Sequence, residues 1–153
     1  MVVGEPQSAL EAASGLPFAG DAGRLLDNML RAIGLSRGAD DGSSPASQAF
    51  LTHALKTSLP TDGSTPCAAD LQQQMARVQP QIILAMGTLA VQALLGSAEP
   101  VGKLRGRVHR CHGVPVIVTY DPGYLLRSPA DKAGAWADLC LARDTLAQSA
   151  GAR

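Results

Sequence analysis

The sequence has 153 residues, of which 46% are hydrophobic and only 3% aromatic. This length and composition predict one globular domain, residues 1–153, with a hydrophobic core of its own. Thirteen basic residues balance thirteen acidic ones. The net charge therefore does not direct the protein toward nucleic acid or toward a membrane surface.

Targeting and redox signals are weak in this sequence. No apolar run approaches the roughly 18 residues that cross a bilayer, and the N-terminus lacks the basic region and long apolar segment of a signal peptide. Three widely spaced cysteines, an odd number, favour reduced thiols: Cys67, Cys111 and Cys140. We expect a cytoplasmic monomer that makes no membrane contact.

Apolar runs and helical patterns alternate along the chain. Strands are predicted at residues 1–3, 50–55, 81–86 and 114–119, and helices at 22–33, 67–78, 88–95 and from Ser128 onward. Asp21 and Ser128 are the expected helix N-caps, and Trp136 is expected to face the core. The alternation predicts an α/β fold: a three-layer α/β/α sandwich around a central four-stranded parallel sheet.

A glycine-rich loop at residues 15–23 leads into the first helix and carries Phe18, one of only two phenylalanines. Backbone amides and a flat ring in such a loop can meet a ligand. In parallel sheets ligands collect beyond the carboxyl ends of the strands. That rule selects residues 4–18, 53–56, 87–88 and 120–127 for a binding site.

A basic stretch lies at residues 103–110. It holds no acid and contains Lys103, Arg105, Arg107, His109 and Arg110. Two interpretations stay open: an edge that faces phosphates, or a solvated hairpin.

Five segments, in the same order along nearly the whole chain, carry a resemblance. They are Gly4-Glu5-Pro6, residues 15–23 (GLPFAGDAG), Leu84-Ala85-Met86-Gly87, Leu104-Arg105-Gly106 and residues 119–127 (TYDPGYLLR). Together they resemble the uracil-DNA glycosylase superfamily, and the closest branch is the iron–sulfur type called family 4. The resemblance implies removal of a uracil that has been flipped out of the DNA stack.

The resemblance also implies roles for individual residues. Phe18 would stack on the uracil, with Pro17 and Gln7 beside it in the base pocket. Leu125 or Leu126 would enter the emptied stack, and Arg127 would hold a backbone phosphate. The basic residues implied to contact DNA are Lys103, Arg105 and Arg107. The implied catalytic positions are Glu5, His53 and Asp121.

Two of these catalytic positions depart from the family pattern. Relatives place Asn where this chain has His53, and His where it has Asp121. An ionised carboxylate only accepts hydrogen bonds, so it would repel the negative charge that develops on the uracil oxygen. Three alternatives stay open: burial keeps Asp121 protonated so that it can donate, His53 and Asp121 pair across neighbouring strand ends and compensate for each other, or the site has decayed.

The cluster cysteines of the iron–sulfur relatives are mostly missing. Of the four positions, only Cys67 matches, and Thr57 follows Lys56 where the third ligand is expected. We predict no iron–sulfur cluster, no metal and no other cofactor. Only three residues precede Gly4, so an upstream segment or fusion partner is expected to be missing.

Two functions follow from the resemblance. The first is base-excision repair: hydrolysis of the glycosidic bond of uracil or another deaminated base in single- or double-stranded DNA. The second is a catalytically inactive module that keeps the fold and binds nucleic acid or a replication or repair protein, as in phage-type DNA polymerase-related proteins. A small-molecule enzyme is disfavoured, because neither a Gly-x-Gly-x-x-Gly turn nor a Walker loop is present.

Overall fold

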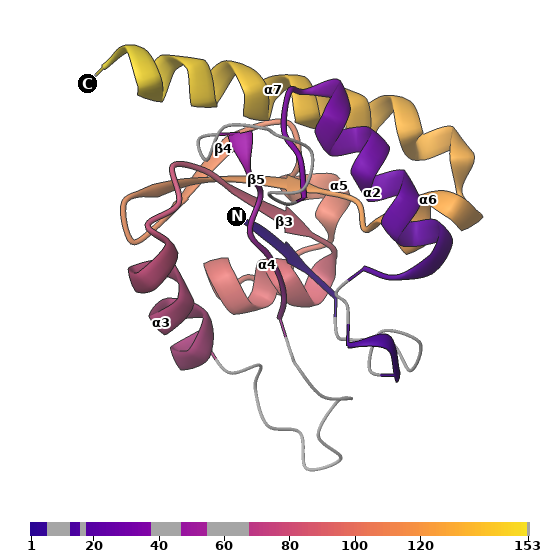
Figure 1. Ribbon diagram of the computed structural model, residues 1–153, viewed down its shortest axis with the longest axis horizontal. Helices are drawn as coiled ribbons and strands as arrows, with labels where there is room; N and C mark the ends of the chain where they lie inside the picture. Colours follow the sequence, from indigo (N-terminus) through magenta and orange to yellow (C-terminus); the bar gives the residue numbers. More distant parts are fainter. Residues whose placement is uncertain (6–12, 16–17, 38–46, 55–67, 153) are drawn as a thin grey trace.

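A five-stranded sheet lies at the centre of the fold (Figure 1). The computed structural model describes residues 1–5, 13–15, 18–37, 47–54 and 68–152. The strands of the sheet are β1 (Val2–Gly4), β2 (Leu51–His53), β3 (Ile83–Met86), β4 (Val108–Cys111) and β5 (Val114–Thr119). They lie in the order β2-β1-β3-β5-β4. The first four are parallel to one another, and β4 runs antiparallel to β5 at the edge.

Helices cover both faces of this sheet. They are α2 (Gly20–Ala32), α3 (Ala68–Val78), α4 (Thr88–Leu95), α5 (Val101–Leu104), α6 (Pro122–Arg127) and α7 (Lys132–Gly151), with a 3₁₀ turn, η3, at Pro129–Asp131. Side chains of α2, α6 and α7 form one core with alternate residues of the strands, and those of α3, α4 and α5 form the other. Within the described residues, none of the helices has the length and apolarity to span a membrane.

The three-layer α/β prediction is confirmed, with four parallel strands as expected. Residues 114–119 and 88–95 form a strand and a helix with the predicted bounds. The strand count was one too low, because β4 in the basic stretch was not predicted. Its residues are mostly solvent-facing and polar, so no apolar run marks them. His112 and Gly113 form the turn between β4 and β5, and both have a positive φ.

Three local predictions were wrong. Trp136 is 47% exposed on α7 and is not a core residue. Asp21 lies inside α2, where its Oδ1 is 3.8 Å from Nη1 of Arg24, and the N-cap residue is Ala19. Ser128 makes no side-chain capping bond, and the chain passes through α6 and η3 before the long helix starts at Lys132. For Asp21 and Ser128, a short polar side chain was assigned a capping bond that the structure does not show.

Candidate functional site

A cavity of about 560 Å³ opens beyond the carboxyl ends of β1, β3 and β5. This is the end of a parallel sheet where ligands collect. The lining comes from four parts of the chain: Glu5, Gly87, Thr88, Pro100, Val101, Gly102, Tyr120, Asp121, Tyr124 and Arg127. Three of the residues implied by the resemblance, Glu5, Asp121 and Arg127, are therefore brought together around one space.

Glu5 follows β1 directly, and the N-terminus of α4 holds its carboxylate. The backbone N–H of Leu89 donates to Glu5 Oε1 at 3.0 Å, and the N–H of Thr88 also contributes a hydrogen bond. Burial raises the pKa of the Glu5 carboxyl, and the Asp121 charge raises it further, while these two N–H groups oppose the rise. A partly desolvated carboxylate, fixed by backbone donors, is suited to act on water or on a nearby cation.

Gly87 is the residue that allows this arrangement. Its φ is +97°, which side chains rarely adopt, and an added Cβ would lie 2.0 Å from Glu5 Oε1. The turn from β3 into α4 therefore has to be glycine for two separate reasons, backbone conformation and space. The shape of this turn sets where the Glu5 carboxylate lies.

Replacing Gly87 with alanine is expected to lower the free energy of unfolding by about 1–3 kcal/mol through backbone strain and to displace the Glu5 carboxylate. Gly96 is the matched control, since its φ is +64° and an added Cβ would meet nothing within 4 Å. Gly96→Ala should lose stability and keep the uracil excision that the resemblance implies, whereas Gly87→Ala should lose both. Urea unfolding and an excision assay measure the two effects, and equal activity in both variants would contradict the assignment of Gly87.

Asp121 is the N-cap of α6. Its Oδ2 accepts a hydrogen bond from the Gly123 N–H at 2.9 Å. The alternative in which Asp121 pairs with His53 requires neighbouring strand ends, and these ends are not neighbours, because β1 and β3 lie between β2 and β5. Chain order does not give strand order in a doubly wound sheet, so this adjacency could not be read from the sequence.

Arg105, expected at the DNA surface, is directed into the protein instead. Its Nε lies 3.0 Å from Oδ2 of Asp138, which is fully buried, and its Nη2 donates to the Gly134 carbonyl at 2.7 Å. The guanidinium also lies 5.6 Å from the centre of the Tyr120 ring, a wall of the cavity. The sequence analysis placed Tyr120 in a site segment but gave no role to Asp138, because an ion pair across 33 residues leaves no local pattern.

Phe18 and His53 form an aromatic pair on the other side of Glu5. Their ring centres are 4.7 Å apart and their planes differ by 28°. His53 Nδ1 lies 2.6 Å from the Glu5 carbonyl oxygen. Phe18 is only 4% exposed, and its ring tip packs so closely on Gly4 that a Cβ there would lie 2.3 Å from Phe18 Cζ. The imidazole thus lies on the ring that the resemblance assigns to base stacking.

The other predicted DNA contacts differ in exposure. Leu125 is 1% exposed and packs in the core, whereas Leu126 is 43% exposed. Of these two leucines, Leu126 is the one that is exposed at the surface. Lys103 and Arg107 are exposed, and Arg127 is exposed at the cavity. Gln7 and Pro17 lie outside the described residues.

Comparison with known proteins identifies the family. The model of the uracil DNA glycosylase superfamily matches residues 1–140. The chain belongs to the uracil DNA glycosylase superfamily. It is similar to the type-4 uracil-DNA glycosylase of Pyrobaculum aerophilum, with 34% identity over 145 residues that cover 85% of this chain and 69% of that protein. The type-4 uracil-DNA glycosylase of Thermotoga maritima is 30% identical over 138 residues, covering 85% and 67%.

A third relative, the type-4 uracil-DNA glycosylase of Archaeoglobus fulgidus, is 29% identical over 141 residues, covering 83% of this chain and 66% of that protein. The chain thus spans about two thirds of the length of these relatives. The resemblance inferred from five sequence segments is confirmed. The superfamily match runs from β1 into the first half of α7, so the cavity and the Phe18–His53 pair both lie inside it.

The three cysteines of this sequence do not by themselves supply the ligands of an iron–sulfur cluster. A cluster takes four thiolate ligands, and the sequence contains three cysteines. Cys111 is buried in β4, and burial raises the pKa of its thiol, which disfavours the thiolate. Cys140 is half-buried on α7, and Cys67 lies outside the described residues. No step of the chemistry below depends on a cluster.

Proposed function

We propose that this chain is a uracil-DNA glycosylase that removes uracil, or a related deaminated base, from DNA by hydrolysis. The observation that carries the proposal is the Glu5 carboxylate held by backbone N–H groups at the edge of the cavity. The names of the related type-4 uracil-DNA glycosylases support it. The reaction breaks the bond between the base and the sugar C1′, and the electron pair leaves with the base.

Glu5 serves the sugar side of this reaction. A positive charge develops on the sugar as the base leaves, and a nearby carboxylate stabilises that charge electrostatically. The same carboxylate accepts a proton from the water that attacks C1′. Because Glu5 must be ionised for both roles and its pKa is raised, the excision rate should fall as the pH drops through that raised pKa.

Asp121 serves the leaving base poorly. The base departs with negative charge, and the glycosylases that the sequence resembles have a histidine donor at the position of Asp121. The Asp121 carboxylate accepts the Gly123 N–H and offers the base no proton while it is ionised. Loss of one oxyanion donor costs about 100- to 1,000-fold in rate. We therefore expect a slow enzyme, limited by departure of the base.

The Asp121→Asn variant tests this account of the charge. Asparagine also caps helices, so α6 should stay folded while the negative charge is lost. The excision rate at neutral pH should rise about tenfold, because repulsion of the leaving base is removed. Without the Asp121 charge the Glu5 pKa falls toward its ordinary value, so the acid limb of the pH–rate profile should move to lower pH.

The control for this variant is Asp144→Asn, which removes a charge from an exposed ion pair with Arg143 on α7. It should leave both the rate and the pH profile unchanged. A slower rate for Asp121→Asn, or an acid limb that does not move, would contradict the electrostatic coupling between Asp121 and Glu5.

DNA is the expected partner of this surface. Arg127 at the cavity and the exposed Lys103 and Arg107 would contact phosphates, and Leu126 would fill the space of the flipped base. Phosphate contacts by arginine and lysine weaken with salt. Binding of a DNA duplex should therefore fall as salt is raised, whether or not the base is removed.

A second candidate function rests on the Phe18–His53 pair. Because Phe18 is 4% exposed and carries the imidazole, the stacking face must open before it can receive a base. A protein that never opens it would bind nucleic acid or a partner protein without catalysis. Incubation with an oligonucleotide carrying one uracil, followed by alkaline cleavage at abasic sites, separates the two. Excision supports the glycosylase, and binding without excision supports the module.

A further inference from the structure

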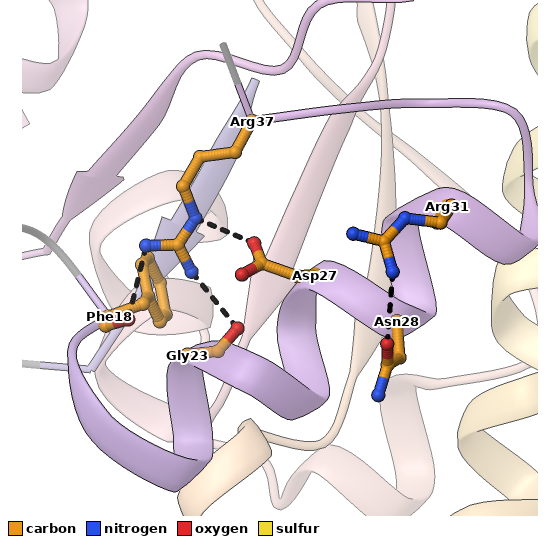
Figure 2. A network of polar contacts seen from close by, with 6 residues as sticks. All are labelled: Phe18, Gly23, Asp27, Asn28, Arg31 and Arg37. Carbon is orange, nitrogen blue, oxygen red and sulfur yellow. Dashed lines mark hydrogen bonds and ion pairs between the residues drawn. The ribbon is translucent and has the colours of Figure 1, made fainter. Parts of the chain in front are cut away.

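The Arg37 side chain forms hydrogen bonds both with the loop that contains Phe18 and with helix α2. Figure 2 shows its guanidinium between Phe18, Gly23 and Asp27. Nη1 donates to the Phe18 carbonyl at 3.1 Å, and Nη2 donates to the Gly23 carbonyl at 3.1 Å. Nε donates to Asp27 Oδ1 at 2.7 Å. Three nitrogens of one planar group are thus directed at three different oxygens, which only arginine can do.

The Phe18 backbone is in a conformation that requires such support. Its φ is +54°, which is rare for a bulky residue. The first turn of α2 approaches so closely that a Cβ on Gly23 would lie 1.8 Å from the Phe18 carbonyl oxygen. The helix N-cap, Ala19, contributes no side-chain hydrogen bond. The Arg37 guanidinium therefore compensates for a strained and closely packed carbonyl next to the aromatic ring.

The backbone next to Arg37 is hydrogen-bonded to the segment that leads into β2, the strand that carries His53. The preceding residue, Ser36, donates its N–H to the Ser47 carbonyl at 2.9 Å, and its own carbonyl accepts the Ala49 N–H at 2.7 Å. Ala49 lies two residues before β2. The Arg37 side chain therefore supports Phe18 from a backbone position that is itself hydrogen-bonded to the approach to β2.

We infer that Arg37, oriented by Asp27, is a positioning residue that sets where the Phe18 ring lies relative to His53 and to an incoming base. The part of this inference that concerns the base rests on the proposed function. The part that concerns the ring does not. Arg37 is not among the residues that line the cavity around Glu5 and Asp121, so its expected effect on the base is exerted through Phe18.

The test compares Arg37→Gln with Arg31→Gln. Arg31 is a matched control because it carries the same charge on the neighbouring helix α2, and its side chain bonds Asn28 at 3.3 Å on a part of that helix away from Phe18 (Figure 2). The first readout is the proton NMR shift of the His53 imidazole, which the stacked Phe18 ring displaces. With three histidines in the chain, a His53→Gln spectrum assigns this signal.

We expect the His53 signal of folded Arg37→Gln to move to the value of a free histidine, and that of Arg31→Gln to stay as in wild type. Arg37→Lys keeps the positive charge but loses the planar guanidinium with its several N–H donors, so its His53 signal should lie between those of wild type and Arg37→Gln. Asp27→Asn, which keeps the guanidinium, should shift the signal less than Arg37→Gln. If Arg37→Gln does not fold, the His53 signals of Arg37→Lys and Asp27→Asn test the inference instead. An unmoved His53 signal in all three would overturn the inference.

The second readout is steady-state uracil excision. Misplacing a reacting or stacking group by about 1 Å can cost 100-fold, so kcat/KM of Arg37→Gln should fall by about that factor, mostly through KM. Unfolding alone would lower the active fraction, and hence kcat, with KM unchanged. If wild type excises no uracil, the proposed function fails, and the imidazole shift still tests the positioning role by itself.

Discussion

Uracil excision by Glu5→Gln is expected to be about 100- to 10,000-fold slower than by wild type, the range that a positioned general base supplies. Glutamine fills the same volume and can still accept the Leu89 N–H that Glu5 Oε1 accepts at 3.0 Å. It lacks the charge that stabilises the sugar cation, and it accepts no proton from water. The measurement is the single-turnover rate with enzyme in excess, so that product release does not limit the rate.

The matched control for that variant is Glu99→Gln, an exposed residue before α5. Its rate should equal that of wild type. Glu5→Gln should also unfold at no lower urea concentration than wild type, because burial raises the pKa of Glu5 and a neutral side chain is easier to bury there. A variant that is stable but no slower than wild type would remove Glu5 from the mechanism.

The Phe18→Ala variant is expected to lose about 3–5 kcal/mol of unfolding free energy, as buried aromatic residues do when truncated, and to lose excision as well. Phe18 is 4% exposed and belongs to the core formed with α2 and α7. Phe50, the other phenylalanine, is 43% exposed. Phe50→Ala should therefore cost far less stability and leave excision intact. Urea unfolding and excision at a temperature where both variants are folded give the comparison.

A Phe18→Leu variant separates packing from stacking. Leucine keeps most of the apolar volume and the same backbone strain, but it offers no aromatic face to a base. We expect it to recover most of the stability and little of the excision. Full recovery of both would mean that Phe18 is only a core residue, and the base would then have to bind elsewhere.

The fold could be predicted where the local pattern decides it. The run at 114–119 is apolar and becomes the buried strand β5, and Gly87 and Gly96 delimit helix α4 at 88–95. The edge strand β4 could not be predicted, since Val108 is 43% exposed and its neighbours in the sequence are basic. Edge strands bury little, so their sequences need no apolar face.

The candidate site could be predicted only as a set of segments. The sequence motifs named Glu5, Phe18, His53 and Asp121, and the structure brings two pairs together, Glu5 with Asp121 and Phe18 with His53. The pairing depends on strand order, which a single sequence does not contain. The motif that suggested Arg105 as a DNA contact likewise carries no sign of its partner Asp138, 33 residues away.

The role of Arg37 was not predicted for a similar reason. It follows α2 and precedes a stretch rich in Gly, Asp and Ser in the sequence, where an arginine is usually a solvent-facing charge. Only the positive φ of Phe18 and the close approach of Gly23 show that a carbonyl there needs a donor. Strained positions of this kind often accompany functional sites, and no periodicity reveals them.

The measurement that tests the central claim most directly is single-turnover excision from an oligonucleotide with one uracil, opposite guanine, opposite adenine and in a single strand. Wild type and Glu5→Gln would be compared at equal excess over DNA. We predict slow but complete excision by wild type in at least one substrate, and at least a 100-fold lower rate for Glu5→Gln. DNA binding by wild type with no abasic product in any substrate would contradict the account, leaving a glycosylase fold that only binds.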